Sequence, residues 1–117
     1  MDKIAHIEIP STNLARSSEF YSELFGWKME PMTGSDEYIT FSAGTGMGGG
    51  ISKVKKAPGE GVVAYVLVKD IDATLKKAVK LGAKVVTPVT EIGGGWGRWA
   101  QFKDPGGCTG VALWSRK

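Results

Sequence analysis

The sequence predicts an α+β fold built from two similar βαβββ modules, each with one helix and four strands that pair mainly antiparallel. Three observations support this prediction. The order of extended and helix-like segments in the first half of the chain recurs in the second half. The pair Asn13-Leu14, at the start of the first predicted helix, has a counterpart in Asp70-Ile71. Gly26 ends the first helix as Gly82 ends the second.

We expect the modules to form one domain over residues 1–117, because two copies are too few for a solenoid. Module one covers about residues 4–54, a linker about 55–61, and module two about 62–117. A chain of this length is long enough for a hydrophobic core and small enough to favour a homodimer.

In module one, residues 4–9 alternate as in a strand, so that His6 and Glu8 share one face. Pro10 is expected to end this strand, and Ser11 or Asn13 to cap the following helix. The helix carries an apolar stripe of Leu14, Tyr21, Leu24 and Phe25. Strands are expected at residues 27–32, at 37–43, and from within the glycine-rich stretch 44–50 to Val54.

Module two repeats this order. Residues 62–68 read as a strand, and Asp70 or Asp72 caps a helix whose buried stripe contains Ile71, Leu75, Ala78 and Val79. Extended segments follow at 83–92, 98–103 and 109–114. A glycine-rich loop at 93–97 carries one large aromatic residue, and a turn lies at 104–107.

Composition and charge exclude several classes of protein. The net charge is +3 and the lysines are scattered, so we expect no nucleic-acid partner. The single Cys108 cannot form an internal disulfide, which favours a reducing, cytoplasmic compartment. The sequence contains no signal region and no apolar run that would span a bilayer, so we expect no membrane partner.

The order and spacing of three stretches resemble the vicinal oxygen chelate (VOC) superfamily, which includes glyoxalase I, fosfomycin- and bleomycin-resistance proteins and extradiol dioxygenases. These stretches are His6 to Trp27, Val68 to Asp72, and Phe102 to Gly107. Within the superfamily, the chain looks like the small glyoxalase-like proteins. The resemblance implies that each module forms a curled half-sheet, that two half-sheets form a cup for a small-molecule ligand, and that the protein is a homodimer.

The resemblance also implies a divalent metal, held by a His in the first strand of each module and a Glu in its last strand. His6 occupies the first of these positions, and it is the only surviving one. The second His of the family set corresponds to Val63, and the Glu of module two corresponds to Val111. The Glu of module one would fall among Gly48 to Gly50, which offer no carboxylate. Because the chain has only one His, this ligand set is too small, and we expect no cofactor.

His6 and Glu8 form the candidate catalytic pair, since a carboxylate enclosed beside an imidazole is suited to acid–base chemistry. The alternatives are a histidine that is only hydrogen-bonded and a glutamate exposed on an edge strand. The candidate ligand-binding residues are Tyr65, Trp96, Arg98, Trp99, Val63 and Val111.

Trp96 is a candidate lid because glycines flank it, and Arg98 is a candidate partner for an anionic ligand group. Aromatic residues such as Tyr65, Trp99 and Trp114 are equally typical of cores and dimer interfaces.

Three functions remain open. The first is a domain that binds or transforms a small molecule without the family metal, for example a lyase or isomerase related to lactoylglutathione lyase. The second is a non-catalytic binding protein of the bleomycin-resistance type. The third is a metal-dependent lyase, isomerase or dioxygenase. Residues 44–49 match G-x-G-x-x-G, but an extended segment follows them instead of a helix, which excludes a dinucleotide site.

Overall fold

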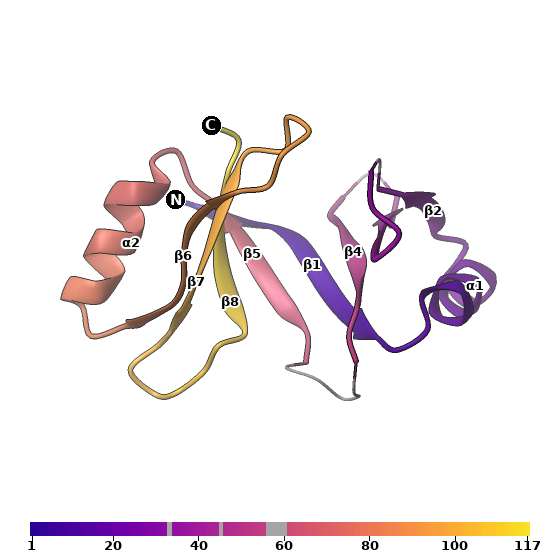
Figure 1. Cartoon of the computed structure of the whole chain (residues 1–117), viewed down its shortest axis with the longest axis horizontal. Helices are drawn as coiled ribbons and strands as arrows, with labels where there is room; N and C mark the ends of the chain where they lie inside the picture. Colours follow the sequence, from indigo (N-terminus) through magenta and orange to yellow (C-terminus); the bar gives the residue numbers. More distant parts are fainter. Residues whose placement is uncertain (33, 45, 56–60) are drawn as a thin grey trace. The chain divides into compact units, whose positions relative to one another are not determined.

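The computed structural model describes residues 1–32, 34–44, 46–55 and 61–117 (Figure 1). The order strand, helix and three strands occurs twice, in agreement with the predicted α+β fold. The elements are β1 (Lys3–Ser11), α1 (Leu14–Phe25), β2 (Lys28–Pro31), β3 (Tyr38–Ser42), β4 (Gly48–Lys53), β5 (Val63–Leu67), α2 (Ile71–Lys80), β6 (Lys84–Glu91), β7 (Arg98–Lys103) and β8 (Val111–Ser115). Most of the predicted linker at 55–61 lies outside the described residues.

The chain divides into two compact units. The first unit is Ala5–Val62, and the second is Met1–Ile4 together with Val63–Lys117. In each unit, the strand before the helix pairs in parallel with the last strand, and the other described pairs are antiparallel. The prediction of mainly antiparallel pairing is therefore confirmed. No helix in the described ranges is long and apolar enough to cross a membrane.

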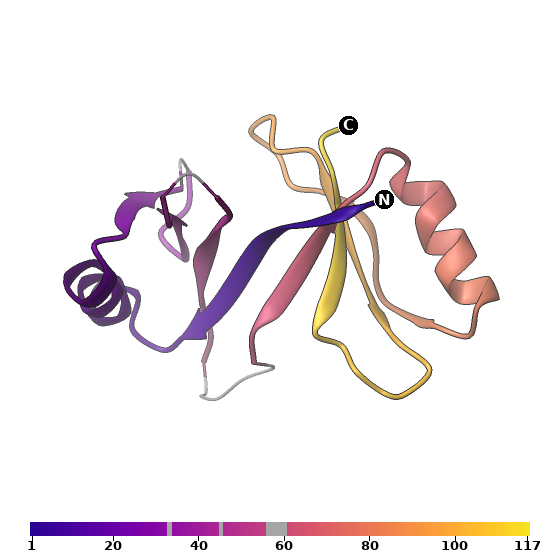
Figure 2. The same cartoon turned by 180° about the vertical axis from the view of Figure 1, so that it is seen from behind.

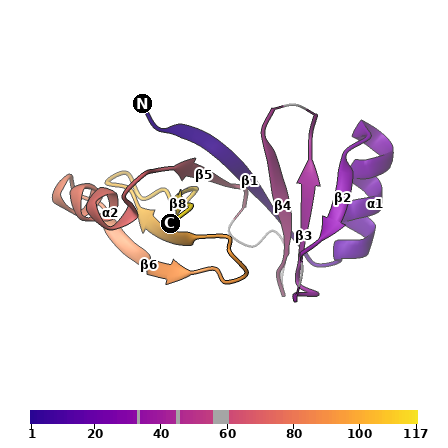
Figure 3. The same cartoon turned by 90° about the horizontal axis from the view of Figure 1, so that it is seen from above.

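The first unit contains the strand order β2-β3-β4-β1, with α1 beside these strands (Figure 3). The Asn13 carboxamide caps α1 by accepting a hydrogen bond from the Arg16 backbone N–H at 3.1 Å. The helix ends at Gly26, whose φ of 74° is readily adopted only by glycine. Both termini were predicted from the sequence. β1 continues beyond Pro10, contrary to prediction, because the Ser11 carbonyl still accepts the Val54 N–H at 2.8 Å.

The predicted apolar stripe of α1 is only partly correct. None of the residues of α1 is buried, and Leu24 and Phe25 are 58% and 57% exposed. The helix contacts Trp27 through two rings: Tyr21 stacks on it with centroids 5.5 Å apart, and Phe25 lies tilted against it at 5.1 Å. Trp27 in turn stacks on Phe41 at 4.5 Å. The stacked rings of Tyr21, Trp27 and Phe41 thus join α1 to β3, because the chain after Gly26 places Trp27 between them.

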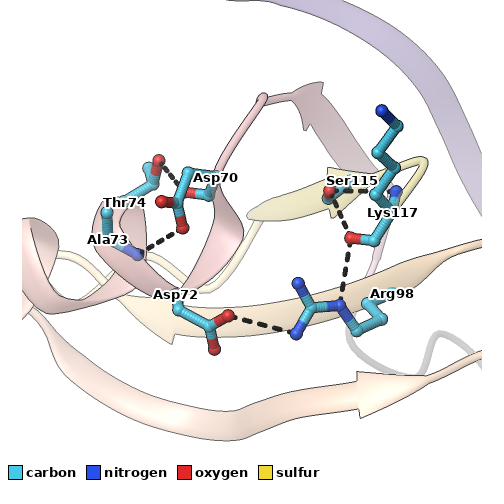
Figure 4. A network of polar contacts seen from close by, with 7 residues as sticks. All are labelled: Asp70, Asp72, Ala73, Thr74, Arg98, Ser115 and Lys117. Atoms are coloured by element: carbon cyan, nitrogen blue, oxygen red, sulfur yellow. Dashed lines mark hydrogen bonds and ion pairs between the residues drawn. The ribbon is translucent and has the colours of Figure 1, made fainter.

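The second unit contains the strand order β5-β8-β7-β6, and α2 contacts β6, β7 and β8 (Figures 1 and 2). Its core consists of Val68, Ile71, Ala100 and Leu113. Asp70 caps α2: its carboxylate accepts the Ala73 N–H at 3.0 Å, and its carbonyl accepts the Thr74 hydroxyl at 2.7 Å (Figure 4). In the predicted buried stripe of α2, Ile71 is fully buried but Val79 is 46% exposed.

Candidate functional site

In the first unit, the face of the sheet opposite Phe41 carries most of the polar side chains. The β1–β4 register pairs His6 with Gly48 and Glu8 with Gly50. The β3–β4 register pairs Tyr38 with Ser52, two positions beyond Gly50. Since paired residues share a face and successive residues alternate, His6, Glu8 and Tyr38 all lie on this face. All three side chains are half-buried.

His6 and Tyr38 are in direct contact. The His6 Nε2 and the Tyr38 hydroxyl are 2.7 Å apart, and the two rings are nearly parallel, with an interplanar angle of 11°. To reach β1, the Tyr38 side chain crosses β4 at Gly50, where an added Cβ would overlap the tyrosine ring and hydroxyl. The absence of a side chain at Gly50 is therefore what allows the pair to form.

Burial lowers the pKa of His6 below its ordinary value, because desolvation disfavours the charged imidazolium. The ring is thus neutral at neutral pH, and it either accepts the phenol proton at Nε2 or donates Nε2–H to the phenol oxygen. A neutral imidazole hydrogen-bonded to a phenol can act as a general acid–base pair, in which one group takes up a proton and the other donates one. The sequence did not indicate this role of Tyr38, because the contact depends on the strand order β3-β4-β1 and on the two registers that join these strands.

In the second unit, three aromatic side chains share the face of the sheet opposite α2. Tyr65 is paired with Ala112 across β5 and β8, and Trp99 with Trp114 across β7 and β8. The Tyr65 and Trp99 rings meet edge to face with centroids 6.4 Å apart. Ala112 lies on the strand between them and is fully buried. We refer to Tyr65, Trp99 and Trp114 as the aromatic face.

Trp96, the predicted lid, is 46% exposed in the loop between β6 and β7. Its carbonyl accepts the Trp114 Nε1–H at 2.8 Å, and its N–H donates to the Gly93 carbonyl at 3.2 Å. The loop is closed further by the Ile92 N–H, which donates to the Gly97 carbonyl at 3.0 Å. The loop backbone is therefore hydrogen-bonded to Trp114 of β8. If Trp96 acts as a lid, its indole ring would rotate while the loop backbone stays in place.

The remaining predicted residues occupy different places in the second unit. Val63 is buried and lies on the side of the aromatic face, whereas Arg98 and Val111 lie on the side of α2 by their register. The Arg98 guanidinium contacts Asp72 on α2 at 3.1 Å and donates through Nε to the Lys117 carbonyl at 3.0 Å (Figure 4). Arg98 thus connects α2 to the segment after β8.

A cavity of about 500 Å³ lies elsewhere in the second unit. None of the described residues that line it is a predicted site residue; they are Met1, Asp2, Lys3, Leu67, Val68, Lys69, Ser115, Arg116 and Lys117. Arg116 also places its guanidinium carbon 5.1 Å from the centre of the Trp114 ring, in a cation–π contact.

The side chains of the described residues do not fit the metal site that the resemblance implies. No three His, Cys, Asp or Glu side chains among them are grouped so that they could hold a metal ion. His6 and Glu8 share a face, but their partners on β4 are glycines, which offer no side-chain ligand. Two donors rarely hold a catalytic metal.

The comparisons with known proteins decide the family. Residues 3–109 match the family model of the Glyoxalase/Bleomycin resistance protein/Dioxygenase superfamily. The chain belongs to this superfamily. It is 35% identical over 98 residues to a glyoxylase-like domain-containing protein of Didymella fabae, in an alignment that covers 78% of this chain and 77% of the relative.

A second relative is the anthracycline biosynthesis protein DnrV of Streptomyces peucetius, 29% identical over 130 residues, with 96% of this chain covered. The chain spans only 46% of that relative. Among solved structures, methylmalonyl-CoA epimerase from Mycobacterium tuberculosis superposes with a TM-score of 0.75 at 18% identity, covering 96% of this chain and 86% of that chain. This likeness supports the fold alone.

Proposed function

We propose that this superfamily member binds a small planar molecule on its aromatic face and does so without a metal ion. The observation that carries the proposal is the grouping of Tyr65, Trp99 and Trp114 on one side of the sheet, with each side chain half-buried. Rigid aromatic side chains supply large contact areas at a small cost in conformational entropy, and they are frequent in ligand pockets. The fully buried Ala112 between Tyr65 and Trp99 leaves the rings as the dominant groups of this surface.

Two further observations support this ligand class. Arg116 over the Trp114 ring adds a positive charge at the margin of the aromatic face, which favours a planar molecule that also carries a carboxylate or phenolate. One relative is named an anthracycline biosynthesis protein, so a fused-ring aromatic compound is a suitable first probe.

Titration of the protein with an anthracycline, followed by tryptophan fluorescence, tests the proposal. We expect Trp99→Leu to weaken binding by about tenfold, because the ring contact is lost while an apolar side chain remains. Phe102→Leu is the matched control: Phe102 lies on the same strand but packs against the core beneath α2, and this variant should bind as the wild type does. An equal loss of affinity in both variants, or no quenching at all, would contradict the proposal.

A second candidate function rests on the His6–Tyr38 contact. A neutral imidazole hydrogen-bonded to a phenol is suited to take a proton from a carbon acid and return it, as a metal-free isomerase requires. Glu8, on the same face, is an additional candidate base.

Deuterium uptake from D₂O into a panel of keto acids and thioesters, measured by NMR, tests this function. We expect His6→Gln to abolish exchange and Tyr38→Phe to reduce it and alter its pH profile. Exchange that persists in His6→Gln would exclude this role for the pair.

A further inference from the structure

The cavity of about 500 Å³ in the second unit lies where the parallel strands β5 and β8 end. Figures 1 and 2 show both ends of the chain on this side of the unit. Leu67 and the buried Val68, at the end of β5, give the cavity an apolar wall. Its volume falls within the range of about 300–1,000 Å³ that is typical of small-molecule pockets.

Hydrogen bonds fix the backbone on both sides of this cavity. The buried Ser115 hydroxyl donates to the Lys117 carbonyl at 2.8 Å and accepts the Lys117 N–H at 3.2 Å (Figure 4). The Arg98 Nε–H donates to the same carbonyl at 3.0 Å. On the side of β5, the Val68 N–H donates to the Trp114 carbonyl at 2.8 Å. The cavity is therefore built on backbone that the fold holds in place.

The side chains around the cavity concentrate positive charge. Among the described residues that line it, one carries a carboxylate side chain, Asp2, and four are cations, namely Lys3, Lys69, Arg116 and Lys117. The net charge of these five side chains, +3, equals the formal net charge of the whole chain, so the rest of the chain has as many acidic as basic residues. In the ranges that the structure describes, none of the four cations forms an ion pair. Their positive potential is thus available to a negatively charged ligand.

We propose that this cavity binds a small organic anion that carries a dianionic head group on an apolar body. A phosphate ester or a dicarboxylate has the head group that Lys and Arg side chains recognise. The apolar body would contact Leu67 and Val68, because burial of apolar surface between them removes it from water.

This site is separate from the aromatic face, and the inference does not depend on the planar ligand proposed above. Arg116 lies between the two sites. It lines the cavity, and its guanidinium carbon is 5.1 Å from the centre of the Trp114 ring. An experiment on the cavity therefore needs a probe without an aromatic ring.

Isothermal titration calorimetry of the full chain with butyl phosphate tests the proposal. We expect saturable binding at one site, and binding of inorganic phosphate or butanol that is weaker by about tenfold or more, because each lacks one half of the ligand. Butylmalonate carries the same tail on a dicarboxylate, so its affinity relative to butyl phosphate shows which head group the cavity prefers. Absence of binding by both dianions would overturn the proposal, as would equal affinities for butyl phosphate and inorganic phosphate.

A pair of double variants separates the cavity from the overall charge of the protein. Lys3→Gln combined with Lys69→Gln removes two of the four cations and should weaken binding of butyl phosphate by about tenfold. Lys76→Gln combined with Lys80→Gln is the matched control, since both of these lysines are exposed on α2 and the change in net charge is the same. The control should bind as the wild type does, and an equal loss in both double variants would contradict the proposed site.

NMR shift mapping locates the bound anion. Butyl phosphate should shift the backbone amide signals of Val68, Lys69 and Arg116 and leave that of Leu81, which follows the other end of α2, unchanged. Trp99→Leu should keep the wild-type affinity for butyl phosphate, so that failure of the aromatic face and failure of the cavity are distinguishable. Loss of butyl phosphate binding in Trp99→Leu would show that the two sites are not separate.

Discussion

Replacement of Gly50 by alanine should disrupt the His6–Tyr38 pair by steric means alone. The backbone of Gly50 is not left-handed, so alanine can adopt its conformation, but the new methyl group would overlap the Tyr38 ring. Forcing such overlap in a packed site costs about 1–3 kcal/mol, and the lost hydrogen bond to His6 adds about 1 kcal/mol. We therefore expect Gly50→Ala to lower the free energy of unfolding by about 3 kcal/mol.

Urea denaturation of a double-mutant cycle measures this effect. In a Tyr38→Ala background the ring is absent, so Gly50→Ala should cost about 0.5 kcal/mol or less, which gives a coupling of about 2–3 kcal/mol. Gly46→Ala is the matched control, because an added Cβ there meets nothing within 4 Å. It should be neutral or stabilise by up to about 1 kcal/mol.

The single histidine supplies a second readout for the same variant. Displacement of the Tyr38 ring exposes the imidazole, so the pKa of His6 should rise toward its ordinary value in Gly50→Ala, as followed by NMR titration. A Gly50→Ala protein with wild-type stability and an unchanged His6 titration would refute the packing of Tyr38 over Gly50.

Three further predictions concern pH, helix capping and metals. The folded-state pKa of His6 is lowered below 6.5, so the unfolded chain binds the proton more readily than the folded chain does. The free energy of unfolding should therefore fall as the pH drops below about 6.5. In His6→Gln, the urea midpoint should no longer depend on pH in this range. Asp70→Ala should lower the free energy of unfolding by about 1 kcal/mol, because the cap of α2 is lost. Asp72→Asn should lower it by less, because the ion pair of Asp72 with Arg98 is largely exposed, and chemical denaturation of both variants compares the two effects. Added Ni²⁺, Co²⁺, Mn²⁺ or Zn²⁺ should leave the melting temperature unchanged, and a stoichiometric metal that disappears in His6→Ala would instead favour the metal-dependent function.

The elements whose signals are local in the chain were predictable from sequence. Asn13, Asp70 and Gly26 carry out their predicted capping roles, since a cap depends only on residues within one turn. The strand that begins inside the glycine-rich stretch was also predictable, because Gly48 to Gly50 precede a β-branched residue. The repeated order of these elements was enough to indicate the α+β fold and the family.

The placement of side chains across strands was not predictable. The His6–Tyr38 contact joins residues far apart in sequence, and it depends on the β3–β4 and β1–β4 registers together. Val111 was predicted to bind ligand, yet the register places it on the side of α2 and its neighbour Ala112 on the side of Tyr65. A difference of one residue in register reverses the face of a whole strand.

The sequence by itself determined the order of helices and strands, their caps, and the single histidine at the centre of the candidate chemistry. Only the tertiary structure decided which side chains meet: Tyr38 over Gly50, the aromatic face around Ala112, and the bond of Arg98 to Asp72. It also left Phe20 and Leu24 of α1 at the surface. The physical reason is that local signals act within one turn or strand, whereas these contacts depend on how strands pair and on which side of a sheet each helix packs.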